Sequence, residues 1–162
     1  MSLRTTDLCD AYPERVQPLT PLFHDYGGRR LWHGEIATVK VFEDNSRVRE
    51  ALEEAGRGRV LVVDGGGSMR CALVGDRIGA MAAGNGWAGV LVYGCIRDSV
   101  ELAGIDLGVK ALNTHPQRSL KKGVGERDVS VTFAGVTLSA GEWLYADEDG
   151  VIVADGELPP AE

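Results

Sequence analysis

Several features that mark other protein classes are scarce in this chain of 162 residues. Its three cysteines, Cys9, Cys71 and Cys95, contain no C-x-x-C pair and cannot all be bridged, which favours reduced thiols in the cytoplasm over a disulfide framework. The N-terminal stretch MSLRTTDLCDAY has no apolar core, so no signal peptide is expected. No apolar run approaches the roughly 20 residues of a membrane-spanning helix, so no membrane partner is expected.

Positive charge is also scarce, because 17 Lys and Arg residues against 24 Asp and Glu residues leave a formal net charge of −7. Direct nucleic-acid binding needs clustered basic residues, and here they are scattered, so no direct nucleic-acid contact is expected. The histidines, His24, His33 and His115, have neither i, i+4 nor H-x-H spacing, which argues against a zinc site. With 44% hydrophobic residues, the chain is expected to form one domain over residues 1–162.

The apolar pattern predicts strands that alternate with helices as far as residue 114. Strands are expected at 34–42, 59–64, 71–74, 88–94 and 108–114, and helices at 7–11, 46–55, 76–84 and 99–105. The helix caps are assigned to Thr5 or Thr6, Asn45 or Ser46, Asp76, and Ser99. Beyond Val129, short alternating runs broken by glycines predict antiparallel β-structure, and residues 155–162 are expected to fray. The predicted fold class is α/β.

Arg97 and Asp98 stand side by side after the apolar run 88–93. In α/β proteins this is where ligand-binding residues follow the carboxyl end of a buried strand. An arginine matches a carboxylate, and an aspartate offers a hard oxygen ligand for Mg²⁺ or Mn²⁺. The alternative is a solvated ion pair at the start of the next helix, worth at most about 1 kcal/mol. Chemistry alone leaves both interpretations open.

The segment Gly75, Asp76, Arg77 and Ile78 is a second candidate, because it opens a predicted helix. Free N–H groups at a helix start bind anions, and a glycine lets a ligand approach the backbone. Taken by itself, a capping role for Asp76 is favoured. The glycine-rich stretch VVDGGGS, residues 62–68, matches neither the Walker nor the dinucleotide motif, so a tight turn beside the site is expected there.

Other reactive or aromatic residues have simpler interpretations. Cys95 lacks a patterned histidine partner and is expected to pack in the interior. A Schiff-base mechanism needs a buried lysine, and none of the four lysines lies in these motifs. The three tryptophans, Trp32, Trp87 and Trp143, are expected in the core or at a subunit interface.

Five segments together resemble one family: LCDAYPERVQPLTPLFHDYGG, TVKVFEDNSRVREALEEAGRGRVLVVDGGGS, RCALVGDRIGAMA, GVLVYGCIRDSVEL and WLYADEDGVIVA. It is the family of the regulator of ribonuclease E activity A, which also contains the class II, metal-dependent 4-hydroxy-4-methyl-2-oxoglutarate aldolases. The resemblance runs nearly end to end. Its most specific feature is the D-x20-R-D motif, here Asp76 followed by twenty residues and then Arg97 and Asp98.

The resemblance implies a β/β/α sandwich similar to the swivelling phosphohistidine domain, with mixed sheets and flanking helices, assembled as a homotrimer or as a hexamer. It implies a lyase that cleaves 4-hydroxy-4-methyl-2-oxoglutarate into two pyruvates and decarboxylates oxaloacetate. By this resemblance Asp98 binds the divalent cation, Mg²⁺ or Mn²⁺, and Arg97 binds the α-keto acid. Gly75, Asp76, Arg77 and Ile78 hold its carboxylate, and Asp76 helps to position water at the cation.

The same resemblance implies an alternative role, inhibition of ribonuclease E by protein contact. Members devoted to that role tend to lose the acidic residue after the arginine, and this chain keeps it as Asp98. A basic partner would meet acidic surface residues, here Glu53, Glu54, Glu101 and Asp106. A phosphohistidine carrier would need a reactive histidine in a mobile loop, and no histidine of this chain stands out as one.

Overall fold

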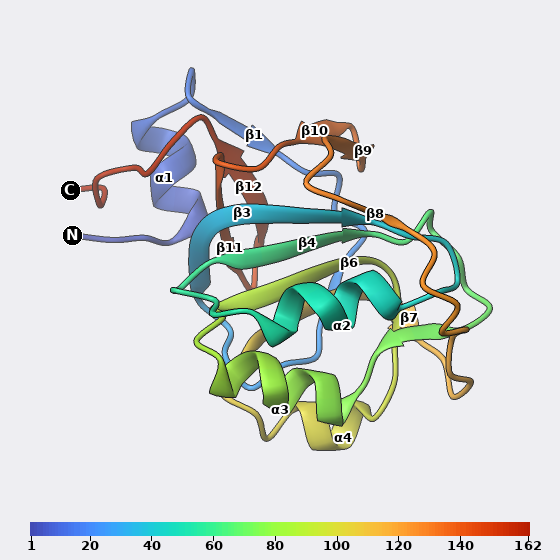
Figure 1. Cartoon of the computed structure of the whole chain (residues 1–162). Coiled ribbons are helices and arrows are strands. Elements are labelled where there is room, and N and C mark those ends of the chain that lie inside the picture. Colours follow the sequence, from blue (N-terminus) through green and yellow to red (C-terminus); the bar gives the residue numbers. More distant parts are fainter.

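A computed structural model describes all 162 residues of the chain (Figure 1). Its four helices are α1 (Thr5–Ala11), α2 (Ser46–Glu53), α3 (Asp76–Gly84) and α4 (Ser99–Leu102). Its twelve strands are β1 (Val16–Pro18), β2 (His24–Asp25), β3 (Trp32–Lys40), β4 (Val60–Asp64), β5 (Ala72–Val74), β6 (Gly89–Ile96), β7 (Gly108–Thr114), β8 (Glu126–Arg127), β9 (Val131–Phe133), β10 (Val136–Leu138), β11 (Trp143–Asp147) and β12 (Gly150–Ala154). None of the helices has the length and apolar character needed to cross a membrane.

Ten strands form one mixed sheet, in the order β1-β12-β11-β3-β4-β6-β7-β2, with β5 against β6 and β8 against β3. The central strands β3, β4, β6 and β7 are parallel, because their connections cross over through α2, α3 and α4. The outer pairs β11–β3, β11–β12, β1–β12 and β2–β7 are antiparallel, and β9 and β10 form a separate hairpin. The predicted α/β class is confirmed, as is the antiparallel structure beyond Val129.

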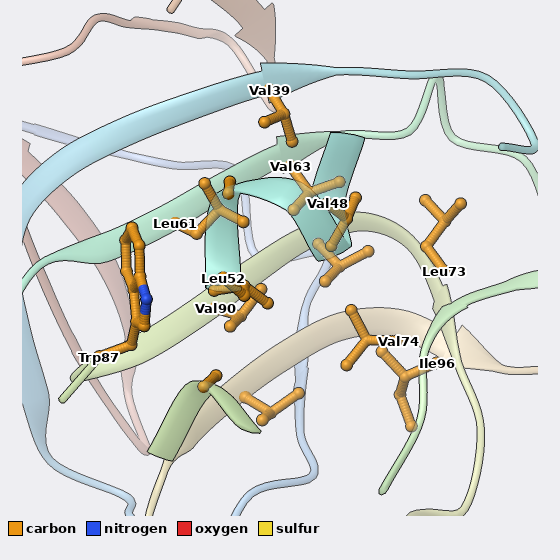
Figure 2. Close-up of a cluster of buried hydrophobic side chains, with 14 of the residues drawn as sticks. Val39, Val48, Leu52, Leu61, Val63, Leu73, Val74, Trp87, Val90 and Ile96 are labelled. Carbon is orange, nitrogen blue, oxygen red and sulfur yellow. The ribbon is translucent and has the colours of Figure 1, made fainter. Parts of the chain in front are cut away.

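Both faces of the parallel strands are buried, which gives three layers. Helices α2, α3 and α4 cover one face (Figure 1), and Figure 2 shows Val48 and Leu52 of α2 beside Leu61 of β4 in the core on that side. On the other face, Val60 and Val62 of β4 pack with the β9–β10 hairpin and with β11 and β12. Because side chains alternate along a strand while both faces are covered, residues 60–63 form a continuous apolar run.

The tail is ordered rather than frayed, which corrects the expectation for residues 155–162. Leu158 and Ala161 are buried and join a small cluster with Leu8 of α1. The Leu158 N–H donates to the Tyr145 hydroxyl at 2.7 Å, and Ala161 pairs with Ser2 as an antiparallel bridge. Two apolar side chains in a polar tail were enough to anchor it, because α1 offers them a surface to cover.

The expected Thr5 or Thr6 cap of α1 is wrong, whereas Asn45 occupies the cap position of α2 as predicted, without a side-chain cap bond. Helix α1 begins at Thr5, whose N–H and hydroxyl both donate to the buried Asp147 carboxylate at 2.7 Å. At α2, Asn45 occupies the cap position but donates from its side chain to the Leu73 carbonyl, at 3.1 Å. The Ser46 N–H is instead accepted by Asp44 at 2.9 Å. The bonds of Thr5 to Asp147 and of Asn45 to Leu73 arise from tertiary packing, which local sequence patterns do not encode, whereas the Ser46–Asp44 bond is local.

Asp44 also fixes the segment that follows β7. Its Oδ2 accepts the backbone N–H groups of Lys122 at 2.8 Å and Val124 at 3.3 Å. Burial opposes ionisation of this carboxyl, but hydrogen bonds from Ser46 and from these N–H groups outweigh it and hold the pKa of Asp44 below its usual value. The chain around residues 118–124 is therefore tied to the end of β3 and the start of α2.

The glycine-rich stretch forms the predicted tight turn, between β4 and β5. Gly66 and Gly67 have φ values of +67° and +72°, which glycine adopts readily. None of the glycines of this turn lines the cleft described below, although Gly65 packs against Leu73, which does.

Candidate active site

A cleft of about 570 Å³ opens where β5 and β6 end. The two strands are parallel neighbours, with Val74 beside Ile96, so the chain leaves both at the same edge of the sheet. Beyond β5 it enters α3, and beyond β6 it enters α4. The structure thereby brings all six predicted site residues into one wall: Gly75, Asp76, Arg77, Ile78, Arg97 and Asp98.

Asp98 joins the two halves of this wall. Its Oδ2 accepts the backbone N–H of Asp76 at 3.0 Å, and the N–H of Arg97 is held by the Val74 carbonyl at 2.9 Å. The capping expectation for Asp76 is therefore wrong: Gly75 takes the cap position, and Asp76 is the first helical residue. The N–H groups of Arg77 and Ile78 follow in the first turn and have no partner within the helix.

The prediction that Ser99 caps α4 is also wrong. Asp98 occupies the cap position with φ +58° and ψ +44°, the left-handed region, and forms no side-chain cap bond. Aspartate adopts this conformation more readily than most residues. The carboxylate is thus turned toward α3 instead of α4, and α4 ends at Leu102 rather than at residue 105.

Gly75 makes the close approach of the two segments possible. A Cβ atom at this position would lie 2.7 Å from Asp98 Oδ2 and 3.4 Å from Arg97 Cγ. The first distance is shorter than real Cβ contacts, so any side chain here would displace the Asp98 carboxylate. The glycine is required by packing at the site, and its φ of −128° needs no special backbone freedom.

The surface ion-pair interpretation of Arg97 and Asp98 is wrong. The ten ion pairs of the chain do not include these two residues, and the Asp98 carboxylate is bonded to α3 instead. Both side chains line the cleft and are half-buried. A guanidinium and a carboxylate are thus held beside a helix start without neutralising each other.

Positive charge dominates the cleft, although the chain as a whole is acidic. Two carboxylates, Asp76 and Asp98, face five cationic side chains: Arg49, Arg77, Arg97, Arg118 and Lys121. The motif analysis did not find Arg49, Arg118 or Lys121, because they come from α2 and from the segment after β7. Their spacing from the D-x20-R-D motif carries no signal, and only the tertiary fold brings them to it.

The cleft suits a hard divalent cation held largely by water and substrate. Asp98 Oδ1 and the Asp76 carboxylate have no hydrogen-bond partner in the protein, so three carboxylate oxygens are available. Mg²⁺ commonly uses one or two carboxylates, with waters and substrate oxygens as the other ligands. No group of three or more His, Cys, Asp or Glu side chains forms a complete protein cage. The donor set therefore fits Mg²⁺ or Mn²⁺ and does not fit a structural zinc site.

The other nucleophile candidates do not fit the cleft. Cys95 is buried, burial raises the pKa of its thiol, and its sulfur lies 3.3 Å from the Met69 sulfur, as expected for a packing residue. Lys110 is buried and pairs with Asp25 at 3.2 Å. Lys121 does line the cleft, which the sequence did not reveal, but it is exposed and lacks the desolvation that activates a Schiff-base lysine.

Comparison with known proteins identifies the family. The RraA-like family model, described as Aldolase/RraA, matches residues 5–153. A protein of Alkalilimnicola ehrlichii named "Putative 4-hydroxy-4-methyl-2-oxoglutarate aldolase" is 66% identical over 161 residues, which are 99% of this chain and 100% of that protein. The structure of "the RNA-processing inhibitor RraA" from Thermus thermophilis is 46% identical, with a TM-score of 0.94 over 98% of this chain and 96% of that one.

A second solved structure is equally similar in fold. It comes from Geobacillus kaustophilus, carries the name S-adenosylmethionine: 2-dimethylmenaquinone methyltransferase, and is 51% identical over 96% of each chain, with a TM-score of 0.94. The names of these relatives differ, but the family model and the identity over nearly the whole chain indicate the same family. The chain belongs to the RraA-like family.

Proposed function

We propose that the chain is a divalent-metal-dependent carbon–carbon lyase, a class II aldolase that cleaves 4-hydroxy-4-methyl-2-oxoglutarate into pyruvate and also decarboxylates oxaloacetate. The observation that supports this is the convergence of a helix start, the Arg97 guanidinium and the free Asp98 oxygen in one cationic cleft. Relatives that carry the aldolase name support it as well. The proposed assembly is a homotrimer, or a hexamer of two trimers.

Each group of the cleft has a defined part in this reaction. The N–H groups of Arg77 and Ile78 at the α3 start would hold the carboxylate of the α-keto acid. Asp98, with Asp76 beside it, would hold Mg²⁺ or Mn²⁺, which when bound supplies stabilisation of negative charge on the keto oxygen. The hydrogen bond from the Asp76 N–H to Asp98 holds the Asp98 carboxylate beside the α3 start before the substrate binds.

The two proposed reactions share their chemistry. Both break a carbon–carbon bond and leave the bonding electron pair on the carbon that becomes the pyruvate methyl group, so an enolate forms. The Arg97 guanidinium would donate hydrogen bonds to the enolate oxygen and stabilise its negative charge. In the aldol cleavage the 4-hydroxyl group loses its proton and becomes the keto group of the second pyruvate, and in the decarboxylation the distal carboxylate leaves as CO₂. The enolate carbon then takes up a proton to give pyruvate. One site can therefore serve an aldol cleavage and a β-decarboxylation.

The test is pyruvate formation from oxaloacetate, followed with a coupled dehydrogenase. Pyruvate should form faster with the protein and Mg²⁺ than with Mg²⁺ alone, and EDTA should abolish this protein-dependent rate. Asp98→Asn should reduce the protein-dependent rate by about 100-fold or more. Light scattering should give three times 17.3 kDa, or twice that mass, for both proteins, which shows that the substitution leaves the assembly intact. Pyruvate formation no faster than with Mg²⁺ alone would remove the proposal.

Inhibition of ribonuclease E by protein contact is the second candidate, supported by the similarity to the Thermus RNA-processing inhibitor. The acidic surface expected to meet the partner is largely neutralised, since Glu53, Glu54 and Asp106 pair with arginines of this chain and only Glu101 does not. Asp98→Asn should spare inhibition while it removes catalysis. RNA cleavage that is unchanged at high protein excess would exclude this role.

Methyl transfer from a sulfonium donor, which the name of the Geobacillus protein suggests, has no support at this cleft. The sulfonium group carries a positive charge, and five cationic side chains line the cleft. Like charges at such short range repel. The lining favours an anionic substrate.

A further inference from the structure

A second site lies away from the cleft, around Lys110 of β7. Lys110 is the register partner of Leu91 on β6, so its side chain enters the apolar layer between the sheet and the β9–β10 hairpin. The side chain is 3% exposed, and no other lysine or arginine of the chain is buried. A buried ammonium group is costly unless neighbouring groups balance its charge and accept its three N–H donors.

Asp25 meets only part of that requirement. It is the register partner of Lys110 on the antiparallel strand β2, and its Oδ1 lies 3.2 Å from Lys110 Nζ. The contact lacks hydrogen-bond geometry, because Asp25 Oδ1 is buried and has no hydrogen-bond partner. Buried polar groups in proteins are nearly always hydrogen-bonded. The Lys110 ammonium group therefore has N–H donors available for a further partner beside Asp25.

A pocket of about 150 Å³ adjoins Lys110. A cavity of roughly this volume can hold a molecule the size of benzene. The pocket has an apolar wall and two exposed carboxylates from the β11–β12 turn, which mark its mouth, whereas the buried Lys110 lies at the inner end. No residue of the pocket belongs to the cleft. The wall consists of Leu19, Phe23 and Val151, and the mouth of Glu148 and Asp149.

The two ends of the pocket carry an excess of opposite charge. At the inner end the Asp25 carboxylate is shared by two cations, since Arg30 lies 3.6 Å from its Oδ2. At the mouth Glu148 pairs with Arg4 of this chain at 2.9 Å, whereas Asp149 has no ion pair. One positive charge is thus in excess inside and one negative charge outside. A complementary ligand carries a carboxylate and an ammonium group on a small apolar body.

We propose that this pocket binds a small aliphatic amino acid. The carboxylate accepts hydrogen bonds from the Lys110 ammonium group, and the amino group of the ligand meets Asp149 at the mouth. The aliphatic side chain of the ligand packs against Leu19, Phe23 and Val151. The site goes beyond the lyase activity and does not depend on it, because the pocket and the cleft share no residue.

The test compares three ligands that share one apolar part: L-valine, isobutylamine, which lacks the carboxylate, and 3-methylbutanoate, which lacks the amino group. Calorimetric titration of wild type should give a Kd for valine about tenfold lower than for isobutylamine. The Kd for valine should be about threefold lower than for 3-methylbutanoate. The second factor is smaller because Asp149 is exposed, and solvent weakens its ion pairs.

Variants assign each preference to one end of the pocket. Lys110→Met combined with Asp25→Asn removes both partners of the inner ion pair, so valine and isobutylamine should bind within about twofold of each other. Asp149→Asn should cancel only the preference over 3-methylbutanoate. Lys122→Met and Asp7→Asn are the matched controls, because both side chains are exposed, form no ion pair and lie outside the pocket. The controls should bind valine as wild type does.

Four results would overturn the site: no binding of valine, equal binding of the three ligands, a preference that survives in its variant, and the same loss in a control. If the double variant does not fold, Asp149→Asn decides, because it changes only an exposed side chain. The lyase is judged separately by pyruvate formation. Valine binding without pyruvate formation keeps the pocket and removes the lyase, and the reverse result removes only the pocket.

Discussion

At the scale of single residues, Asp98 shows how the backbone directs a functional group. Its left-handed conformation turns the carboxylate back toward α3, where one oxygen accepts the Asp76 N–H and the other has no partner. An extended conformation would have placed Arg97 and Asp98 on opposite faces of a strand. The bend after β6 therefore allows two adjacent residues to line the same cleft.

Gly75→Ala tests how tightly the Asp98 carboxylate must be placed. The new Cβ would lie 2.7 Å from Asp98 Oδ2, and this atom ends a side chain that can swing away, so the fold should persist. The carboxylate would then move and lose the Asp76 N–H, and lyase activity should fall by about 100-fold, as a displacement of about 1 Å can cause. Steady-state kinetics and the melting temperature measure the two effects.

The control for this substitution is Gly84→Ala, at the other end of α3. A Cβ there meets nothing within 4 Å, so activity should be unchanged and stability equal or slightly higher. Gly75→Ala with full activity would show that the close approach is not needed. A loss of stability that matches the loss of activity would make it a folding defect instead.

At the scale of elements, two paired glycines create a slot in the sheet for Trp32. Gly89 of β6 and Gly108 of β7 are register partners, and a Cβ on either would lie 2.2 Å from the Trp32 ring. Trp32 is 2% exposed, so its ring fills the space that the two missing side chains leave. A bulky residue at the start of β3 thus packs against two strands that lie beyond β4 in the sheet.

Gly108→Ala should destabilise the protein by about 1–3 kcal/mol, because a buried ring cannot move aside as an exposed side chain can. Chemical denaturation measures the loss, and Trp32→Leu in the same chain should recover part of it. Recovery arises because the smaller side chain vacates the space that the new methyl group needs. A Gly108→Ala protein as stable as wild type would mean that the strands shift to absorb the methyl group.

The sequence predicted elements well where one periodic pattern determined them. Residues 59–64 and 108–114 read as buried strands and are β4 and β7, because both faces of a parallel sheet are apolar. The predicted tryptophan positions are confirmed for the core at Trp32 and Trp87, both 2% exposed. The α1 cap and the tail were predicted wrongly, because the α1 start is held by Asp147 and the tail by the cluster around Leu8, and both contacts join distant parts of the chain.

The sequence likewise identified some residues of the candidate site and not others. The D-x20-R-D spacing identified the wall formed by Asp76, Arg97 and Asp98, since β5 and β6 are adjacent parallel strands and a fixed spacing can encode their exits. Arg49 and Arg118 could not be identified, because their positions depend on how α2 and the segment after β7 pack around β5. A motif records only the part of a site that has constant spacing.

At the scale of the whole molecule, two buried carboxylates tie together parts of the chain that are far apart in sequence. Asp147 joins α1 to β11, and Asp44 joins the segment after β7 to the start of α2. Burial opposes ionisation of Asp147 too, but hydrogen bonds from Thr5 and Asp149 outweigh it and lower its pKa. Both carboxylates are therefore lowered in pKa by contacts that exist only in the folded chain.

These two carboxylates predict how stability depends on pH. An unfolded aspartate has a pKa of about 3.9, and in the folded chain both pKa values are lower, so the unfolded chain binds protons first as the pH falls. Their contribution is complete above about pH 4 and is lost as the pH falls through the lowered folded values. Urea midpoints should thus stay level from neutral pH to about pH 5 and drop below about pH 4.

Asp44→Asn and Asp147→Asn should each lower stability at neutral pH and flatten the acid slope, because the titrating group and its charged acceptor are gone. The exposed Asp10, which makes no hydrogen bond, provides the control: Asp10→Asn should leave both midpoint and slope unchanged, and an equally flattened slope there would assign the acid sensitivity to general charge repulsion instead.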